Sequence, residues 1–248
     1  MKTKLNLVFA LLLSAVLSIT TLNAQEAKTD YGMAEVTYMM PKTGMEKAFE
    51  DAVKAHNEKY HKEGPYKANL DYILTGKETG WYVWVMGPCT FTDLDSRPND
   101  DAHRMDWDKN VSPKVYKYGR NEYWRYNDKL SYRGDASDNA KLENLWFLDI
   151  ADGKGDEFRG FMEKVKKAYE KKGKGHFMLY FNQFSEDNGR DAAIVWTMDK
   201  WGEMDMDDGG IKDSYEEIYG EGSWEKALDV WRSAVTSVKS QMWKIGVN

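Results

Sequence analysis

An internal duplication is the feature that most constrains this chain of 248 residues. One amphipathic segment occurs twice, and its members are paired at a constant spacing of 109 positions: Phe49 with Phe158, Val53 with Met162, His56 with Val165, and Tyr60 with Tyr169. Further along, Phe91 and Trp201 are 110 positions apart. A repeat of this kind predicts two copies of one supersecondary unit that bury their apolar faces against each other.

The first copy predicts the element order strand, helix, strand, strand, helix, strand. Alternating apolar residues indicate strands at 33–40, 68–74, 81–86 and 121–127. Thr43 and Glu46 have the spacing of a capping box, which predicts a helix that ends before Gly64-Pro65. A second helix is expected over 101–118, kinked or divided by Pro113.

The second copy repeats this order. Strands are expected at 142–150, 177–184 and 192–198, and Asp152 is expected to cap the helix that carries Phe158. Residues 224–238 have helical spacing. In the last strand, Trp243 is the counterpart of Trp124 of the first copy, 119 positions earlier. The longer spacing predicts an acidic insertion near 206–220, with Asp207-Asp208-Gly209-Gly210 as a solvated turn.

Each copy therefore reads as a βαββαβ unit, which predicts a four-stranded antiparallel sheet with two helices on one face. Strands at 81–86 and 145–148 are apolar on both faces, so the face without helices must also be covered. The expected fold class is α+β: two ferredoxin-like repeats (33–128 and 142–248, joined by a linker at 129–141) pair sheet to sheet within one chain. Trp84, Trp146 and Trp196 are expected in the core.

The first 24 residues have the pattern of a signal peptide, with Lys2 and Lys4 before an apolar run and a small residue at Ala24. We expect cleavage after Ala24, an N-terminal extension at 25–32, and a soluble periplasmic or secreted protein without membrane insertion. The formal net charge of −6 argues against nucleic acid as a partner. Cys89 has no partner for a disulfide within the chain. One chain that carries both halves is expected to be a monomer or a weak oligomer.

The element order, the doubly apolar strands and the duplication resemble the dimeric α/β-barrel superfamily, and within it the antibiotic-biosynthesis-monooxygenase and NIPSNAP-type members. The resemblance spans about 33–128 and 142–245. It implies a fold shared by cofactor-free oxygenases, isomerases, haem-degrading enzymes and chlorite-dismutase-like haem proteins. Haem-degrading members have an Asn on the first strand with a Trp and a His on the second helix, and neither copy holds that full set.

His103 and Trp107 are the candidate site residues, because they lie where this superfamily often has its pocket. His103 is the candidate for an acid/base or ligand-binding role, and Trp107 for a pocket wall. His56 lies on the apolar helix face and is expected to be a packing residue. His61 is five positions further on, so it is expected to face elsewhere, at the surface, and no metal site is predicted. His176 is also expected at the surface.

Three functions follow from the sequence, in this order. The first is binding of a small apolar or aromatic molecule in a barrel pocket. The second is a cofactor-independent monooxygenase or isomerase with His103 as acid/base. The third is a haem-binding protein that uses His103, although no cofactor is predicted. The copies differ most after their third strands, so a site is expected in that region.

Overall fold

The computed structural model describes residues 31–184, 189–206 and 209–247. The expected signal peptide, residues 25–30 of the expected N-terminal extension, and Asp207-Asp208 of the expected solvated turn lie outside these ranges. No helix in the described part of the chain is long and apolar enough to cross a membrane.

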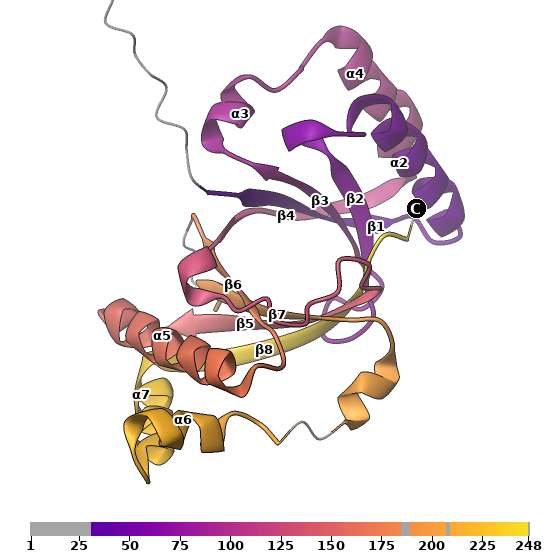
Figure 1. The fold of residues 1–248 in the computed structure, drawn as a ribbon. Helices are drawn as coiled ribbons and strands as arrows, with labels where there is room; N and C mark the ends of the chain where they lie inside the picture. The colour runs from indigo at the N-terminus through magenta and orange to yellow at the C-terminus, as the bar shows by residue number, and fades with distance from the viewer. Residues whose placement is uncertain (1–30, 185–188, 207–208, 248) are drawn as a thin grey trace, which may run out of the picture. The chain divides into compact units, whose positions relative to one another are not determined.

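The first copy folds into a four-stranded antiparallel sheet in the order β4-β1-β3-β2. Its strands are β1 (Met33–Pro41), β2 (Ala68–Ile73), β3 (Tyr82–Cys89) and β4 (Val115–Tyr126). Helices α2 (Glu46–Tyr60), α3 (Phe91–Asp95) and α4 (Asp101–Asp106) lie on one side of this sheet (Figure 1).

The second copy has the equivalent order β8-β5-β7-β6. Its strands are β5 (Leu142–Ile150), β6 (Met178–Asn182), β7 (Ala192–Met198) and β8 (Val235–Lys244). Its sheet is covered by α5 (Gly155–Lys172) and α7 (Ser223–Ala234), and the inserted segment contributes α6 (Lys212–Tyr219) beside them (Figure 1).

The two sheets close into one barrel, because β2 pairs with β8 and β4 pairs with β6. Apolar residues from both copies fill the space between the sheets, among them Val36, Val83, Leu145, Val195 and Trp243. The doubly apolar strands thus bury one face against their own helices and the other inside the barrel. The predicted fold class is confirmed.

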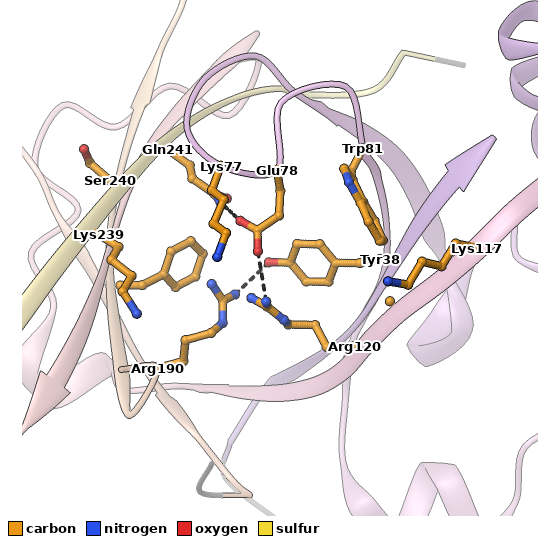
Figure 2. Close-up of a pocket in the computed structure, with 12 residues that line it drawn as sticks. Tyr38, Lys77, Glu78, Trp81, Lys117, Arg120, Arg190, Lys239, Ser240 and Gln241 are labelled. Atoms are coloured by element: carbon orange, nitrogen blue, oxygen red, sulfur yellow. Dashed lines mark hydrogen bonds and ion pairs between the residues drawn. The ribbon is translucent and has the colours of Figure 1, made fainter. Parts of the chain in front are cut away.

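A buried ion pair joins the copies inside the barrel. Arg190, just before β7, donates from Nε to Glu122 Oε1 at 2.6 Å and from Nη2 to Glu122 Oε2 at 2.8 Å. The same Nη2 donates to the Tyr38 hydroxyl at 2.7 Å. Glu122 and Tyr38 belong to the first copy, so one side chain of the second copy ties two strands of the first. Figure 2 shows the contact of Arg190 with Tyr38.

The expected second helix of the first copy was too long. The helix α4 ends at Asp106, one π-helical turn covers Trp107–Val111, and a 3-10 turn around Pro113 leads into β4 at Val115. Pro113 has no N–H for a helical hydrogen bond, and β4 gains pairs with β1 from Val115 onward. The strand therefore begins six residues earlier than expected.

Three smaller expectations were also wrong. Neither Thr43 nor Asp152 caps a helix, because α2 begins at Glu46 and α5 at Gly155, each without a side-chain cap. Val235 and Val238 lie in β8, where these β-branched residues pair with β5. Trp146 is 37% exposed on the outer side of the second sheet, where its ring makes a T-shaped contact with the half-buried Trp196. Trp84 is buried as expected.

Two carboxyl groups lie at one end of the barrel interior. Asp71 is buried, and its Oδ1 accepts the Gly246 N–H at 2.8 Å. Burial raises the pKa of Asp71 to about 7, and burial together with the nearby Asp71 raises the pKa of Glu143 to about 8. Glu143 lines a cavity that Arg133 and Tyr180 also line. The fold thus stabilises the protonated forms of both groups.

We expect Asp71→Asn to stabilise the protein at alkaline pH but not at acid pH. A folded pKa above the unfolded value gives stability that is complete below about pH 4 and is lost as the pH rises through about 7. The variant should match the native chain at about pH 4 or below and exceed it by about 2–4 kcal/mol at pH 8.5, in urea unfolding. Exposed Asp95→Asn is the control, and parallel pH profiles for native and Asp71→Asn proteins would contradict the expectation.

Candidate metal centre

Three histidines of the first copy meet between α2 and α4. His56 lies in the last part of α2, His61 is the residue that follows its last turn, and His103 lies in α4. His56 and His61 are buried, and His103 is half-buried. The rings pack against aromatic neighbours: Trp107 meets His56 edge-on, Trp84 meets His61 edge-on, and Tyr60 stacks on His103. Packing therefore fixes all three rings.

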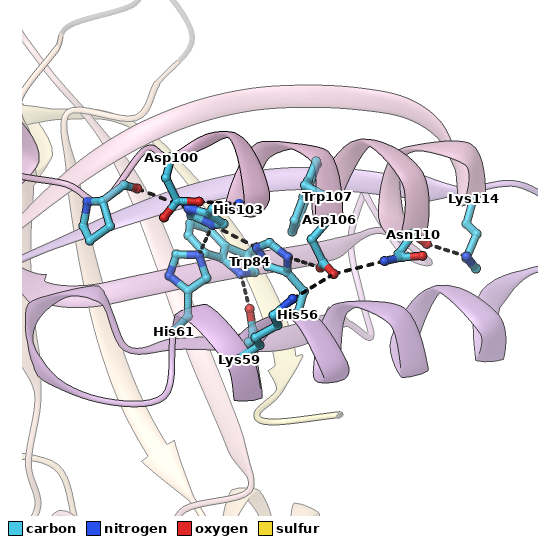
Figure 3. A network of polar contacts seen from close by, with 12 residues as sticks. His56, Lys59, His61, Trp84, Asp100, His103, Asp106, Trp107, Asn110 and Lys114 are labelled. Atoms are coloured by element: carbon cyan, nitrogen blue, oxygen red, sulfur yellow. Dashed lines mark hydrogen bonds and ion pairs between the residues drawn. The ribbon is translucent and has the colours of Figure 1, made fainter.

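The three Nε2 atoms converge on one point. His103 Nε2 lies 3.1 Å from His56 Nε2 and 3.1 Å from His61 Nε2 (Figure 3). One ligand atom from each ring lies within 4.8 Å of the other two. In the described part of the chain, this is the one group of three or more potential metal ligands gathered so closely.

The other ring nitrogen of each histidine has an acceptor. His61 Nδ1 lies 2.8 Å from the Tyr66 carbonyl oxygen, and His103 Nδ1 lies 3.1 Å from the Pro98 carbonyl oxygen. A carbonyl only accepts, so both Nδ1 atoms carry the hydrogen. His56 Nδ1 lies 2.8 Å from Asp106 Oδ2 and donates to this carboxylate in the same way. Each neutral ring therefore directs a lone pair from Nε2 toward the others.

Burial keeps two of the rings neutral. It lowers the pKa of His56 despite the opposing effect of Asp106, and it lowers the pKa of His61 to about 4. At neutral pH no proton is then available on these two Nε2 atoms to bridge the 3.1 Å contacts. The lone pairs of His56 and His61 then face His103 Nε2, and a positive ion, either a proton or a metal, is needed among the three atoms to offset their repulsion. A metal ion satisfies all three at once.

The separations suit a transition-metal ion. Zinc–nitrogen bonds of about 2.0–2.1 Å in a tetrahedron place two ligand nitrogens about 3.3 Å apart, close to the two observed separations. Imidazole ligands favour zinc, copper, iron and nickel over magnesium and calcium. A ligating histidine also usually donates its second ring N–H to a carboxylate or carbonyl. Asp106, Tyr66 and Pro98 supply those acceptors here.

A pocket of about 250 Å³ opens beside the cluster. His61, His103 and Arg97 line it together with an aromatic wall and two residues of β1: Trp84, Trp107, Tyr118, Thr37 and Met39. Three histidine ligands leave a fourth tetrahedral position for water or substrate, as in catalytic zinc sites. The cluster can thus present an ion to a molecule held in this pocket.

Arg97 adds a positive charge to the pocket. Its Nη2 is paired with the Glu35 carboxylate, while its Nε is buried and has no hydrogen-bond partner. Glu35 also accepts from Asn121 Nδ2 at 3.2 Å, which fixes the carboxylate. Glu35 thus holds in place the guanidinium that lines the pocket, while the buried Nε lies out of reach of a bound molecule.

The second copy does not repeat the cluster. Val165 stands where His56 stands, Glu170 stands where His61 stands, and α7 contains no histidine. The fourth histidine, His176, is half-buried and bonds to Asp135 Oδ1 at 2.9 Å and to the Thr197 carbonyl oxygen at 3.0 Å. Any chemistry of the histidine cluster therefore belongs to the first copy alone.

Sequence reasoning placed His103 and Trp107 together, and the structure brings both to this pocket. Of the other two histidines, the position expected for His61 was wrong. His61 is buried rather than exposed, and it reaches His103 because the helix ends at Tyr60 and the chain turns away from helical spacing. His56 is buried as expected but directs Nε2 at His103. The signal was available: three of the four histidines lie in the helical segments of one copy.

Comparison with known proteins gives the fold. No protein-family model matches the chain, and no curated protein sequence is similar to it at a significant level. Solved structures do match, including one described as a "putative monooxygenase" from Lactobacillus acidophilus, at 10% identity and a TM-score of 0.52, covering 87% of this chain and 94% of that one.

Two other matches agree. A protein from Fusobacterium nucleatum with the same description is 11% identical, with a TM-score of 0.52 and coverage of 87% and 92%. A mutant chlorite dismutase from Candidatus Nitrospira defluvii is 8% identical, with a TM-score of 0.51 and coverage of 91% and 95%. These neighbours are dimeric α/β-barrel proteins, and at such identities they show that this chain shares their fold.

Proposed function

We propose that this protein is a metal-dependent oxygenase that holds a transition-metal ion on His56, His61 and His103 and a small aromatic substrate in the adjoining pocket. The observation that carries the proposal is the convergence of three Nε2 lone pairs, with each Nδ1 occupied by an acceptor. The likeness in fold to proteins described as monooxygenases supports the reaction class.

The chain's own groups have distinct tasks in this proposal. The three imidazoles bind the ion and leave a position open for dioxygen or substrate. The walls formed by Trp84, Trp107 and Tyr118 pack against a flat substrate and exclude water, while Arg97 holds an anionic or phenolic oxygen. The pocket of about 250 Å³ limits the substrate to a small molecule.

This proposal revises the functions expected from the sequence. It keeps the pocket and the small aromatic molecule, and it replaces cofactor-independent chemistry with a metal ion. A haem ligand is less well supported, because His103 Nε2 is directed at two other histidines. The pocket is also smaller than the roughly 300–1,000 Å³ typical of drug-sized ligands. The antibiotic-biosynthesis-monooxygenase and NIPSNAP-like kinship, the tandem duplication and export remain part of the proposal.

The test is metal binding followed by oxygen uptake. The full chain, stripped with a chelator, is titrated with Co²⁺ and Cu²⁺, and ligand-field absorption reports coordination by nitrogen. We expect one ion per chain. The Cu²⁺- and Fe²⁺-loaded proteins are then assayed in an oxygen electrode with naphthols, hydroquinones and anthrones. Absence of stoichiometric binding would overturn the whole proposal, and binding without oxygen uptake would leave the metal centre but remove the oxygenase.

Asp106 is expected to act as a positioning residue for the ion. Asp106→Ala removes the acceptor of His56 Nδ1–H, so the ring loses its fixed orientation and part of its basicity. Metal affinity should fall by about 10–100-fold, measured by competition with a chromophoric chelator. Asp108→Ala, an exposed position two residues away, is the matched control. Equal affinities for the two variants would contradict the expectation.

A further inference from the structure

A second and larger cavity lies at one mouth of the barrel, on the other face of the same sheet. It measures about 790 Å³ and is lined by residues of both copies. Side chains alternate along β1, so Thr37 and Met39 line the histidine pocket whereas Tyr38 lines this cavity. Along β4, Tyr118 faces the histidine pocket whereas Lys117 and Gly119 face the cavity. The two cavities are therefore distinct, and this one belongs to the seam between the copies.

Positive charge dominates the lining. Five cationic side chains contribute to it: Lys77, Lys117, Arg120, Arg190 and Lys239. Glu78 is the one carboxylate in the lining, and Glu122 lies behind it in contact with Arg190. These seven groups carry a formal charge of +3, in a chain whose formal net charge is −6. A concave surface with such an excess concentrates the field and attracts anions.

The carboxylates are already engaged. Glu78 Oε1 accepts from Arg120 Nη2 at 2.9 Å, and its other oxygen accepts from Gln241. Glu122 accepts both Nε and Nη2 of Arg190. The two arginines are thus fixed side by side at the base of the cavity, and Lys77, Lys117 and Lys239 surround its opening (Figure 2).

Aromatic rings form part of the same lining. Tyr38, Trp81 and Phe147 contribute to it, and Lys117 Nζ lies 5.9 Å from the centre of the Trp81 ring. Flat apolar surface beside a ring of cations suits a molecule with an aromatic body and an acidic group. The volume lies within the range of about 300–1,000 Å³ found for sites that hold small molecules.

We propose that this cavity, formed by Tyr38, Trp81, Phe147, Lys77, Lys117 and Lys239 above the Arg120–Arg190 base, is a binding site for an aromatic organic anion. The site is independent of the histidine cluster, because the two lie on opposite faces of the first sheet. It exists only where the two copies meet, so neither copy contains it alone.

The test uses a pair of probes with the same ring skeleton. 8-Anilinonaphthalene-1-sulfonate carries a sulfonate, and N-phenyl-1-naphthylamine does not. Both are titrated by fluorescence into the full chain and into Lys77→Gln/Lys117→Gln/Lys239→Gln. We expect saturable binding of the sulfonate, weakened about tenfold or more in the variant and by added salt. The uncharged probe should change less than about twofold, because it lacks the group that the lysines attract.

Two further variants make the result specific. Lys54→Gln/Lys167→Gln/Lys226→Gln removes the same charge from exposed helix positions and should bind the sulfonate like the native chain. Lys239→Trp places an indole at the cavity, because Lys239 pairs with the inward-facing Phe147, and it should abolish binding of both probes. Equal weakening by the two triple variants, undiminished binding to Lys239→Trp, or no saturable binding to the native chain would each overturn the site. His103→Ala should leave sulfonate binding unchanged, so this test stands apart from that of the metal centre.

Discussion

Replacing His103 with alanine is expected to reduce Co²⁺ affinity by roughly a hundred- to a thousand-fold. Zinc sites with four ligands bind with apparent free energies of about 10–16 kcal/mol, so one ligand accounts for roughly 3–4 kcal/mol. His103 is the central ligand, because its Nε2 is the atom that lies 3.1 Å from both of the others. Its removal leaves two imidazoles and no fixed geometry. Isothermal titration of the chelator-treated protein measures the change.

The effect of added metal on the melting temperature shows whether His103 is a metal ligand or only a packing residue. A bound ion stabilises the folded chain by about 4 kcal/mol when its concentration is about 1,000 times the dissociation constant. The native protein should therefore gain melting temperature when Co²⁺ is added, and His103→Ala should not. Without metal the two proteins should melt at similar temperatures, since loss of the half-buried His103 ring mainly removes a crowded set of lone pairs.

His176→Ala is the control for this experiment. Like His103, His176 is half-buried and its Nδ1 has a partner, in this case Asp135, but it lies in the second copy, away from the cluster. It should bind Co²⁺ like the native chain. If His176→Ala and His103→Ala lost affinity equally, or if neither lost it, the assignment of the ligands would be wrong.

The sequence predicted the fold well because the fold follows from apolar patterns. The strand expected at 142–150 and the one at 192–198 match β5 and β7 to the residue. Strands apolar on both faces required a cover, and the duplicate sheet provides it. Errors arose where a helix passes into a strand, at Val115 and Val235, because local periodicity gives no sign of which neighbour a residue will pair with.

The site was predicted in part, since His103 and Trp107 were chosen and His56 and His61 were not. Comparison of the copies counted against both missed residues, because their counterparts are Val165 and Glu170. That comparison identifies what the two copies share, which is the fold. A site that arose in one copy must appear as a difference between them. The end of α2 at Tyr60, which turns His61 toward His103, depends on chain geometry that residue spacing does not show.

The second large effect is expected at the ion pair that joins the copies, where Glu122→Gln should destabilise the fold by about 3–5 kcal/mol. The side chains of Glu122 and Arg190 are 1% and 5% exposed, so the substitution leaves a buried guanidinium without its counter-ion. For a chain of this size we expect the melting temperature to fall by roughly 10 °C. Differential scanning calorimetry of the metal-free proteins measures the change.

A double variant shows whether the loss of stability comes from the unpaired charge of Arg190 or from a lost hydrogen bond. Glu122→Gln/Arg190→Met removes both charges. The introduced amide would retain an oxygen to accept the Trp124 indole N–H, which Glu122 Oε2 accepts at 3.0 Å in the native chain. Because a buried pair stabilises little over an apolar replacement of both members, the double variant should recover more than about half of the loss. Asp51→Asn, which breaks an exposed pair with Lys47, should hardly change the melting temperature.

The Glu122–Arg190 pair also allows a test of whether the two copies unfold together. Arg190 belongs to the second copy, whereas Glu122 and Tyr38 lie on adjacent strands of the first. Loss of the charge pair weakens the contact between the two copies rather than either sheet. The Glu122→Gln protein should therefore still melt in one transition, with both copies unfolding together. Two separated transitions in the calorimeter would show that each copy is stable without the other, and would contradict the view of one barrel with one shared core.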